Sequence, residues 1–297
     1  MRLRYLKNEF FKGISYFAAV IAVFTLVLII GKIFIVSLPS LNFDFLLTSE
    51  SATGGLGGGV ANAVVGTILL SILSPLIAAP LAVGTAVYLK RYARENFFTR
   101  TLSFCIDVLS GAPSIVVGAF GFLVLAIYLK PITGGFSLIS GVIALAILIL
   151  PVIEKATETA IDTVPEELEQ ASYALGATSS QTIRFVTLPY AMIGIISGIV
   201  LSIGRAAEES AIVVLTAGYS QHMPSLKIVP DDGLLFGLRF YPFQSQVATL
   251  PIATYHGFEF PKLVNVSESF AAAFILILIV MLINLGARLL LRRKRIG

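Results

Sequence analysis

Residues 185–218 read FVTLPYAMIGIISGIVLSIGRAAEESAIVVLTAG, an apolar run broken by one arginine and two glutamates. The charged residues are Arg205, Glu208 and Glu209, and Ser210 follows them directly. A helix needs about 20 apolar residues to cross the hydrocarbon core of a membrane. The run therefore predicts a membrane-spanning helix, and it raises the question of why three charges stand inside it.

The composition of the whole chain supports a membrane protein. Of its 297 residues, 57% are hydrophobic and 13% are charged, and the mean hydropathy is +0.92. Soluble domains carry roughly 25% charged residues, so this chain lacks the residues to cover a water-facing surface. The single cysteine, Cys105, excludes an internal disulfide, and we expect it to be a small core residue.

The distribution of apolar residues predicts an all-α polytopic membrane protein with a single transmembrane domain over residues 1–297. The first apolar segment is too long for the apolar part of a signal peptide, so we expect a retained helix. Two prolines in the second segment, Pro75 and Pro80, are expected to kink it. Six spans are expected, at residues 14–38, 60–89, 109–129, 136–153, 189–217 and 270–287.

The positive charges predict the orientation of these spans. Lys and Arg are concentrated in cytoplasmic loops of membrane proteins. Fifteen of them lie at the two termini and in the connections after the second and fourth spans, against four in the other connections. Both termini are therefore expected in the cytoplasm, with a cytoplasmic loop at about 154–188 and a long extracytoplasmic loop at about 219–267.

The stretch DTVPEELEQASYALG, residues 162–176, predicts a short amphipathic helix in the cytoplasmic loop. Pro165 suits a first turn, acidic residues favour the positive end of the helix dipole, and Gly176 suits the position after a helix. Residues 178–181 then have the pattern of a capping box. On the residues alone, this helix is either a surface connector between two spans or a segment that docks in a partner's groove.

The same loop resembles the coupling loop of permease subunits in binding-protein-dependent ABC importers. Their pattern is Glu-Ala-Ala, three residues, Gly, nine residues, Ile, one residue and Leu-Pro. Aligned on Gly176, this chain differs at three of those positions and carries Glu169 one step before the expected glutamate. The aligned residues are Gln170-Ala171-Ser172, Gly176, and Val186-Thr187-Leu188-Pro189.

Further stretches resemble one branch of that family, the A-type (PstA) permease subunits of phosphate-specific ABC importers. The resemblance extends over residues 54–288, which we expect to form the permease core. The stretches that carry it are SGAPSIVVG at 110–118, QASYALG at 170–176, residues 204–217, ATLPI at 248–252, Gly66-Thr67, and VGTAVYL at 83–89.

The resemblance implies a type I ABC importer permease fold and a subunit that forms half of a phosphate pathway in the cell membrane. The implied protein partners are a second permease of the C type (PstC), an ATPase dimer (PstB) that binds ATP and Mg²⁺, and an extracytoplasmic phosphate-binding protein (PstS). The chain is also expected to contact membrane lipid, and it is not expected to bind nucleic acid. It places Glu169, Gln170, Ala171, Gly176, Leu188 and Pro189 in the contact with the ATPase.

Helical spacing gives the charged stretch two readings. Arg205 is three residues from Glu208 and four from Glu209, so both carboxylates are expected to reach its guanidinium. Such a group would be either a self-neutralised ion pair that fixes helix packing or the lining of a pathway. A guanidinium suits phosphate because it offers paired donors and stays charged. By the resemblance, Arg205, Glu209 and Ser210 align with the family's translocation residues, and Glu208 replaces a glycine.

Other chemistry finds little support in the sequence. The glycine cluster at 54–59 lacks the lysine of a phosphate-binding loop and is expected to be a flexible lead into the second span, so ATP would be hydrolysed by another polypeptide. His222 and His256 stand alone, and Asp107 is expected at the interface. The alternatives left open are a permease for another oxyanion, a homodimeric permease, and an intramembrane channel or enzyme in which Glu208 and Glu209 relay protons.

Overall fold

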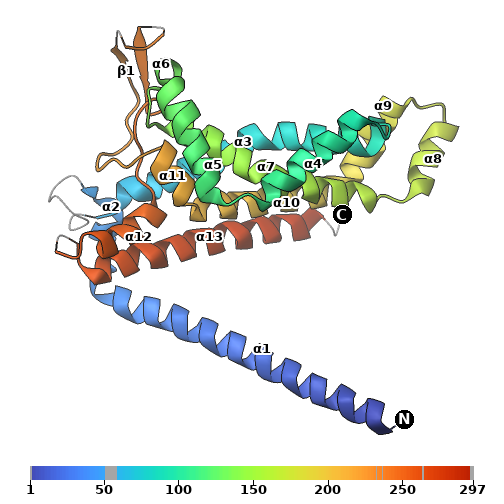
Figure 1. Cartoon of the computed structure of the whole chain (residues 1–297), viewed down its shortest axis with the longest axis horizontal. Coiled ribbons are helices and arrows are strands. Elements are labelled where there is room, and N and C mark those ends of the chain that lie inside the picture. The colour runs from blue at the N-terminus through green and yellow to red at the C-terminus, as the bar shows by residue number, and fades with distance from the viewer. Residues whose placement is uncertain (1, 51–58, 232, 236, 263, 295–297) are drawn as a thin grey trace.

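The computed structural model describes residues 2–50, 59–231, 233–235, 237–262 and 264–294, and most of them are helical. Five helical segments are long and apolar enough to cross a membrane, or up to six if one bent helix pair counts as a span. Four of them pack side by side as a bundle (Figure 1). The bundle helices are α3 (Ala61–Val87), α7 (Leu138–Asp162), α10 (Leu188–Glu208) and α13 (Val266–Lys294).

Shorter elements connect these helices or cap their ends. Pro75 and Pro80 lie inside α3, which nevertheless continues unbroken to Val87. The connecting elements are η1 (Leu38–Ser40), α2 (Phe43–Leu47), η4 (Tyr88–Tyr92), α6 (Lys130–Thr133), α8 (Glu166–Ala174), α9 (Ser179–Thr182), η6 (Ile183–Thr187), α11 (Ala211–Thr216), β1 (Lys227–Pro230), β2 (Leu238–Tyr241) and α12 (Leu250–Glu259).

Helix α7 is the centre of the bundle. Its residues Leu138, Leu145, Ile149 and Ile153 are fully buried, and it packs against α3 on one side and α10 on the other. By contrast, α1 (Arg2–Ser37) leaves the bundle toward its N-terminus (Figure 1) and is exposed along almost all of its described side chains. The apolar surface of α1 must therefore be covered by something outside this chain.

The contact between α7 and α10 is built from small residues. Gly194 and Gly198 of α10 lie one turn apart and face Ala160 and Ala156 of α7. A Cβ atom added at Gly198 would lie 2.4 Å from the Cβ of Ala156, and one at Gly194 would lie 2.5 Å from that of Ala160. Small residues four positions apart allow helix backbones to approach closely inside membranes. This small-residue seam fixes the distance between the two helices.

The third expected span differs from the prediction. A continuous helix over 109–129 is wrong, because α4 (Phe97–Gly111) ends before Ala112-Pro113 and the chain then turns by 105° into α5 (Ser114–Gly121) and η5 (Phe122–Tyr128). Ala112 has extended backbone angles, as expected for a residue that precedes proline. Cys105 of α4 is exposed rather than in the core.

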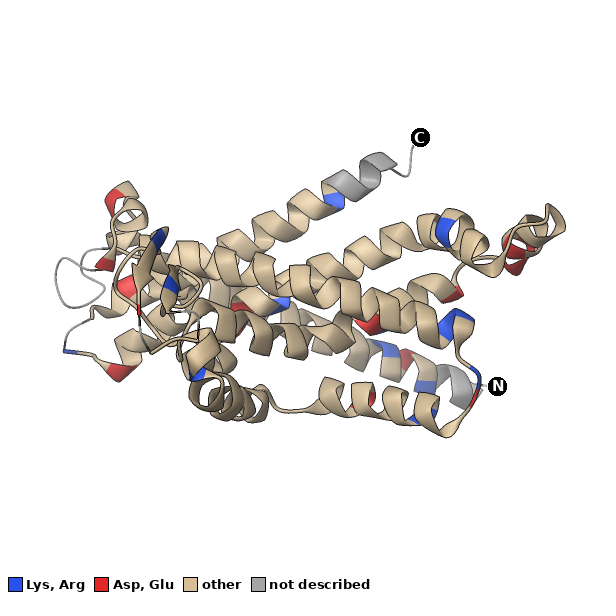
Figure 2. Ribbon diagram, turned by 90° about the horizontal axis from the view of Figure 1, so that it is seen from above, with Lys and Arg blue, Asp and Glu red and all other residues tan. Residues whose placement is uncertain are grey.

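The two ends of the bundle carry most of the charged residues, as Figure 2 shows. The α8 end contains α8 and η4. The opposite, hairpin end contains the antiparallel strands β1 and β2, in which Lys227 pairs with Tyr241 and Pro230 with Leu238, together with α12. The loop expected at 219–267 is therefore ordered over its described residues. Residues 54–58 of the glycine cluster, which was expected to form a flexible segment before the second span, lie outside the described residues.

The small-residue seam gives a prediction for stability. Gly198→Ala should lower the free energy of unfolding by about 1–3 kcal/mol, because the new methyl group overlaps Ala156 and forces the helices apart. The matched control is Gly84→Ala in α3, where a Cβ atom meets nothing within 4 Å. Thermal unfolding of the detergent-solubilised protein measures both variants. Equal melting temperatures for the two would contradict the proposed role of the seam.

Candidate functional site

The charged stretch lies where a helix stops and restarts. Helix α10 ends at Glu208, Glu209 has extended backbone angles, and α11 begins at Ala211. The Glu209 carboxylate accepts hydrogen bonds from the backbone N–H groups of Ala211, at 3.1 Å, and Ile212, at 3.4 Å. The first N–H groups of a helix have no partner within it and favour a negative charge. Glu209 therefore satisfies the first turn of α11.

This break changes the expected ion-pair geometry. The prediction that both carboxylates reach the guanidinium of Arg205 is wrong in this structure. Within the described residues, Arg205 has neither an ion pair nor a side-chain hydrogen bond. For Glu209 the reason is that the helix ends at Glu208, so Glu209 leaves the helical position one turn after Arg205 and turns to α11. Glu208 stays on the same helix face as Arg205, but the two side chains form no ion pair in the described residues.

Arg205 lies on an exposed stripe of α10. Leu201, Arg205 and Glu208 are spaced four and three residues apart, so they share one helix face, and all three are exposed. The exposed fraction of Leu201 is 61%, so the stripe mixes apolar and charged side chains. An unpaired charge costs about 2.5–3.5 kcal/mol at the centre of a bilayer by insertion scales. The stripe is therefore suited to face another protein or a water-filled passage rather than lipid.

A second group of expected site residues lies at the α8 end. Figure 1 shows α8 projecting away from the bundle. Glu169 of α8 is held in place: its Oε1 atom lies 3.0 Å from both Nε and Nη2 of Arg91 and accepts a hydrogen bond of 2.7 Å from the Thr187 hydroxyl. These contacts tie α8 to η4 and η6, and we call them the Glu169 clamp.

The rest of α8 is open to a partner. Gln170 and Ala171 are exposed, and Leu175, which follows the helix, is 90% exposed. Gly176 has a φ of +85°, a left-handed conformation that glycine adopts without strain. The expected acidic first turn and the capping box from Thr178 to Gln181 are both present. Leu188 is half-buried and Pro189 exposed at the start of α10.

Sequence reasoning missed the partners of Glu169. Arg91 lies 78 positions away in η4, and Thr187 lies 18 positions away in η6. Neither spacing belongs to a motif that a single sequence reveals. The only available signal was the complementary charge of the connections after the second and fourth expected spans, which is too general to select a pair.

The hairpin end holds a buried polar network that sequence reasoning also missed. Glu50 is 2% exposed and accepts a hydrogen bond of 2.5 Å from the Tyr219 hydroxyl. Asn62 donates to the same carboxylate at 3.4 Å and to the carbonyl of Ser220 at 2.9 Å. Burial raises the pKa of Tyr219, and the nearby Glu50 raises it further. Burial lowers the pKa of His256, whose ring packs against Tyr219.

A third polar cluster joins α4 to α7. Lys155 lies 3.1 Å from Asp107 and 3.3 Å from Glu158, while the neighbouring Glu154 is fully buried and its carboxylate oxygens have no hydrogen-bond partner. Asp107, expected at the interface, thus links the two helices. Among the described residues, no group of three or more His, Cys, Asp or Glu side chains is arranged to hold a metal ion.

Comparison of the sequence with known protein families assigns the chain to one of them. Residues 78–296 match the family described as "Binding-protein-dependent transport system inner membrane component". The chain belongs to this family of ABC importer permeases. It is thus a multi-pass subunit of the inner membrane that is not itself an enzyme, and it works with an ATPase and a binding protein. The channel and intramembrane enzyme readings are thereby set aside.

Individual relatives refine the position of the chain within the family. It is 39% identical over 202 residues to "Probable ABC transporter permease protein YqgI" of Bacillus subtilis (strain 168), and the aligned region covers 68% of this chain and 67% of the relative. It is 35% identical over 243 residues to "Phosphate transport system permease protein PstA 1" of Mycobacterium tuberculosis H37Rv, covering 80% and 73%. With PstA of Pasteurella multocida the identity is 30% over 291 residues, covering 98% and 96%.

A solved structure supports the fold. The chain superposes on the inward-facing MetNI methionine ABC transporter with a TM-score of 0.61 and 18% identity, covering 79% of this chain and 95% of that one. At this identity the likeness concerns the fold alone. The expected type I ABC importer permease fold is confirmed, with the third span bent as described above.

The Glu169 clamp gives a prediction. Glu169→Ala should lower the free energy of unfolding by about 1–3 kcal/mol, because it leaves the half-buried Arg91 and the buried Thr187 without their shared acceptor. Glu167→Ala, an exposed carboxylate in the same turn of α8, is the matched control and should change stability little. A double-mutant cycle of Glu169→Ala with Arg91→Ala measures the coupling. Additive effects would show that the contact between Glu169 and Arg91 contributes nothing to the clamp.

Proposed function

We propose that this chain is the A-type permease subunit of an ATP-driven phosphate importer. The relatives named PstA support the substrate, since one of them aligns with almost the whole chain. The observation that carries the role of the site is the exposure of Arg205 without a carboxylate partner in the described residues. Its guanidinium donors are therefore available for a passing oxyanion.

The exposed stripe of α10 would face a second, homologous permease of the PstC type. In that arrangement Arg205 binds phosphate by paired hydrogen bonds, which a planar guanidinium provides. Glu208, on the same stripe, limits how tightly the anion is held, because transport requires a site that also releases its ion. Ser210 adds a hydroxyl beside the break. Glu209 acts indirectly, by holding α11 in place.

The α8 end would receive the ATPase. Both termini and α8 lie in the cytoplasm under this proposal, and a dimeric PstB-type ATPase that binds ATP and Mg²⁺ holds the exposed side of α8 in a cleft. Gln170 and Ala171 would contact the ATPase, whereas Glu169 transmits the contact through Arg91 and Thr187 to η4 and η6. A PstS-type phosphate-binding protein would dock at the hairpin end.

Arg205→Ala tests the proposed pathway. Uptake of phosphate by the complete complex in vesicles should fall about 100-fold, which corresponds to the loss of about 3 kcal/mol from a charged contact. Assembly should be unchanged, because Arg205 makes no ion pair among the described residues. The matched control is Arg100→Ala, an exposed arginine of α4 outside the stripe.

The readouts separate the alternatives. Radiolabelled phosphate measures uptake, and co-purification of the ATPase measures assembly. Normal phosphate uptake by Arg205→Ala at normal abundance would contradict the role of Arg205. Uptake of sulfate or another oxyanion, but not of phosphate, by the unmodified complex would favour the alternative of an ABC permease for that oxyanion.

A further inference from the structure

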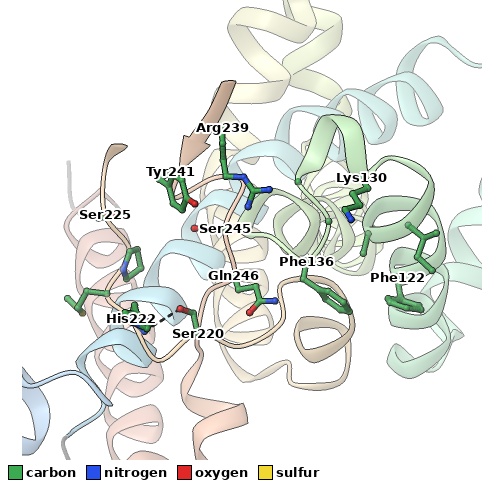
Figure 3. Close-up of a pocket in the computed structure, with 16 residues that line it drawn as sticks. Phe122, Lys130, Phe136, Ser220, His222, Ser225, Arg239, Tyr241, Ser245 and Gln246 are labelled. Atoms are coloured by element: carbon green, nitrogen blue, oxygen red, sulfur yellow. Dashed lines mark hydrogen bonds between the residues drawn. The ribbon is translucent and has the colours of Figure 1, made fainter. Parts of the chain in front are cut away.

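A basic pocket at the hairpin end is separate from Arg205. It has a volume of about 710 Å³ and is shown in Figure 3. Its walls come from η5, the start of α6 and the loop after it, the segment that follows α11, strand β2 and the segment after β2. Arg205 is not among the residues that line it. The pocket therefore constitutes a different site from the exposed stripe of α10.

The pocket presents positive charge without a carboxylate on its walls. Lys130 and Arg239 line it, together with hydroxyls of serine and tyrosine, and none of the sixteen described lining residues is Asp or Glu. In Figure 3 the ammonium of Lys130 and the guanidinium of Arg239 point into the space between them from opposite walls. Such a lining attracts an anion and offers hydrogen-bond donors to it.

Arg239 is held in this position by an ion pair. Its Nε lies 2.9 Å from Oδ2 of Asp231, which is outside the pocket lining. This contact occupies one edge of the guanidinium, and the two Nη groups remain as donors. An arginine fixed at Nε loses less side-chain freedom when it binds a ligand.

The walls of the pocket are joined by hydrogen bonds between distant segments. Gln244 donates to the carbonyl of Ile132 at 2.7 Å and accepts from the N–H of Phe240 at 2.8 Å. Gly134 has a φ of +83°, and a Cβ atom there would lie 2.9 Å from the carbonyl oxygen of Gln244. The loop after α6 and the segment after β2 therefore have a fixed separation, so the pocket is formed before any ligand arrives.

We propose that this pocket binds a tetrahedral oxyanion of the phosphate type at the hairpin end. The inference rests on the proposed function in one respect, since it places the pocket on the side at which the binding protein docks. The pocket would receive the anion before it reaches Arg205, with Lys130 and Arg239 supplying charge and Tyr241 and Ser220 supplying hydroxyls. A free phosphate ion and the phosphate of a lipid headgroup share this chemistry.

The test uses thiol labelling of the assembled complex without ATP, so that it does not depend on transport. In a background of Cys105→Ser, the change Ser225→Cys places one thiol of this chain in the pocket lining. A negatively charged methanethiosulfonate reagent should modify it about tenfold faster than a positively charged one of similar size, because the pocket attracts anions. Inorganic phosphate at ten times its Kd should slow labelling roughly tenfold.

Charge-removing variants provide the comparison. Lys130→Gln together with Arg239→Gln should abolish both the preference for the anionic reagent and the protection by phosphate. Lys130→Gln alone breaks no ion pair among the described residues. It should remove part of the preference for the anionic reagent and part of the protection by phosphate. The proposal therefore remains testable with this single variant if the double variant fails to fold. Lys227→Gln is the matched control, an exposed lysine of β1 outside the lining.

Lipid composition separates the two sources of phosphate. Protection by inorganic phosphate in phospholipid-free micelles assigns the site to the free ion, whereas protection by phospholipid nanodiscs without added phosphate assigns it to a headgroup. Equal labelling by both reagents, with no protection from either source, would overturn the proposal. Because labelling needs no ATP, a complex that fails to import phosphate can still pass this test, which keeps the two proposals distinguishable.

Discussion

The carboxylate of Glu209 makes it possible for a helix to stop between α10 and α11. In a membrane, backbone N–H groups that lack an internal partner have no water to bind and cost several kcal/mol each. Glu209 supplies an acceptor for the N–H groups of Ala211 and Ile212. The break that it stabilises turns Glu209 away from the helical position one turn after Arg205, whose guanidinium lies on the exposed face of α10. The geometry of the candidate pathway thus depends on a residue that does not itself need to contact the anion.

The Glu169 clamp has a comparable role at the α8 end. A short helix that projects from a bundle transmits force only if its base is fixed. Arg91 belongs to the π-helical turn that continues α3, and Thr187 belongs to the turn that leads into α10. One carboxylate therefore connects α8 to two helices of the bundle, while the exposed Gln170 and Ala171 remain for a partner. The fixed contact in this chain is made by Glu169, one position before Gln170, which aligns with the family's glutamate.

The features that sequence predicts best are those with a strong local signal. The apolar runs that became α3, α7, α10 and α13, the acidic first turn of α8, Gly176 and the capping box at Thr178 all follow from short-range chemistry. Prediction failed where a break in a helix or a contact between distant segments decides the geometry. The Arg205 ion pairs were expected from helical spacing, but the cap of α11 removed Glu209 from that spacing. Arg91, Glu50 and the pocket around Lys130 required the tertiary structure.

The small-residue seam between α7 and α10 has a mechanical consequence. Two helices whose glycine and alanine surfaces are in close contact have little spare volume in which to slide, since packed interfaces switch between discrete arrangements rather than deform continuously. We therefore expect α7 and α10 to turn together as one lever arm. The backbone ladder of this pair stops at Glu208, where α10 ends, so no continuous helix resists a change of angle between the pair and α11.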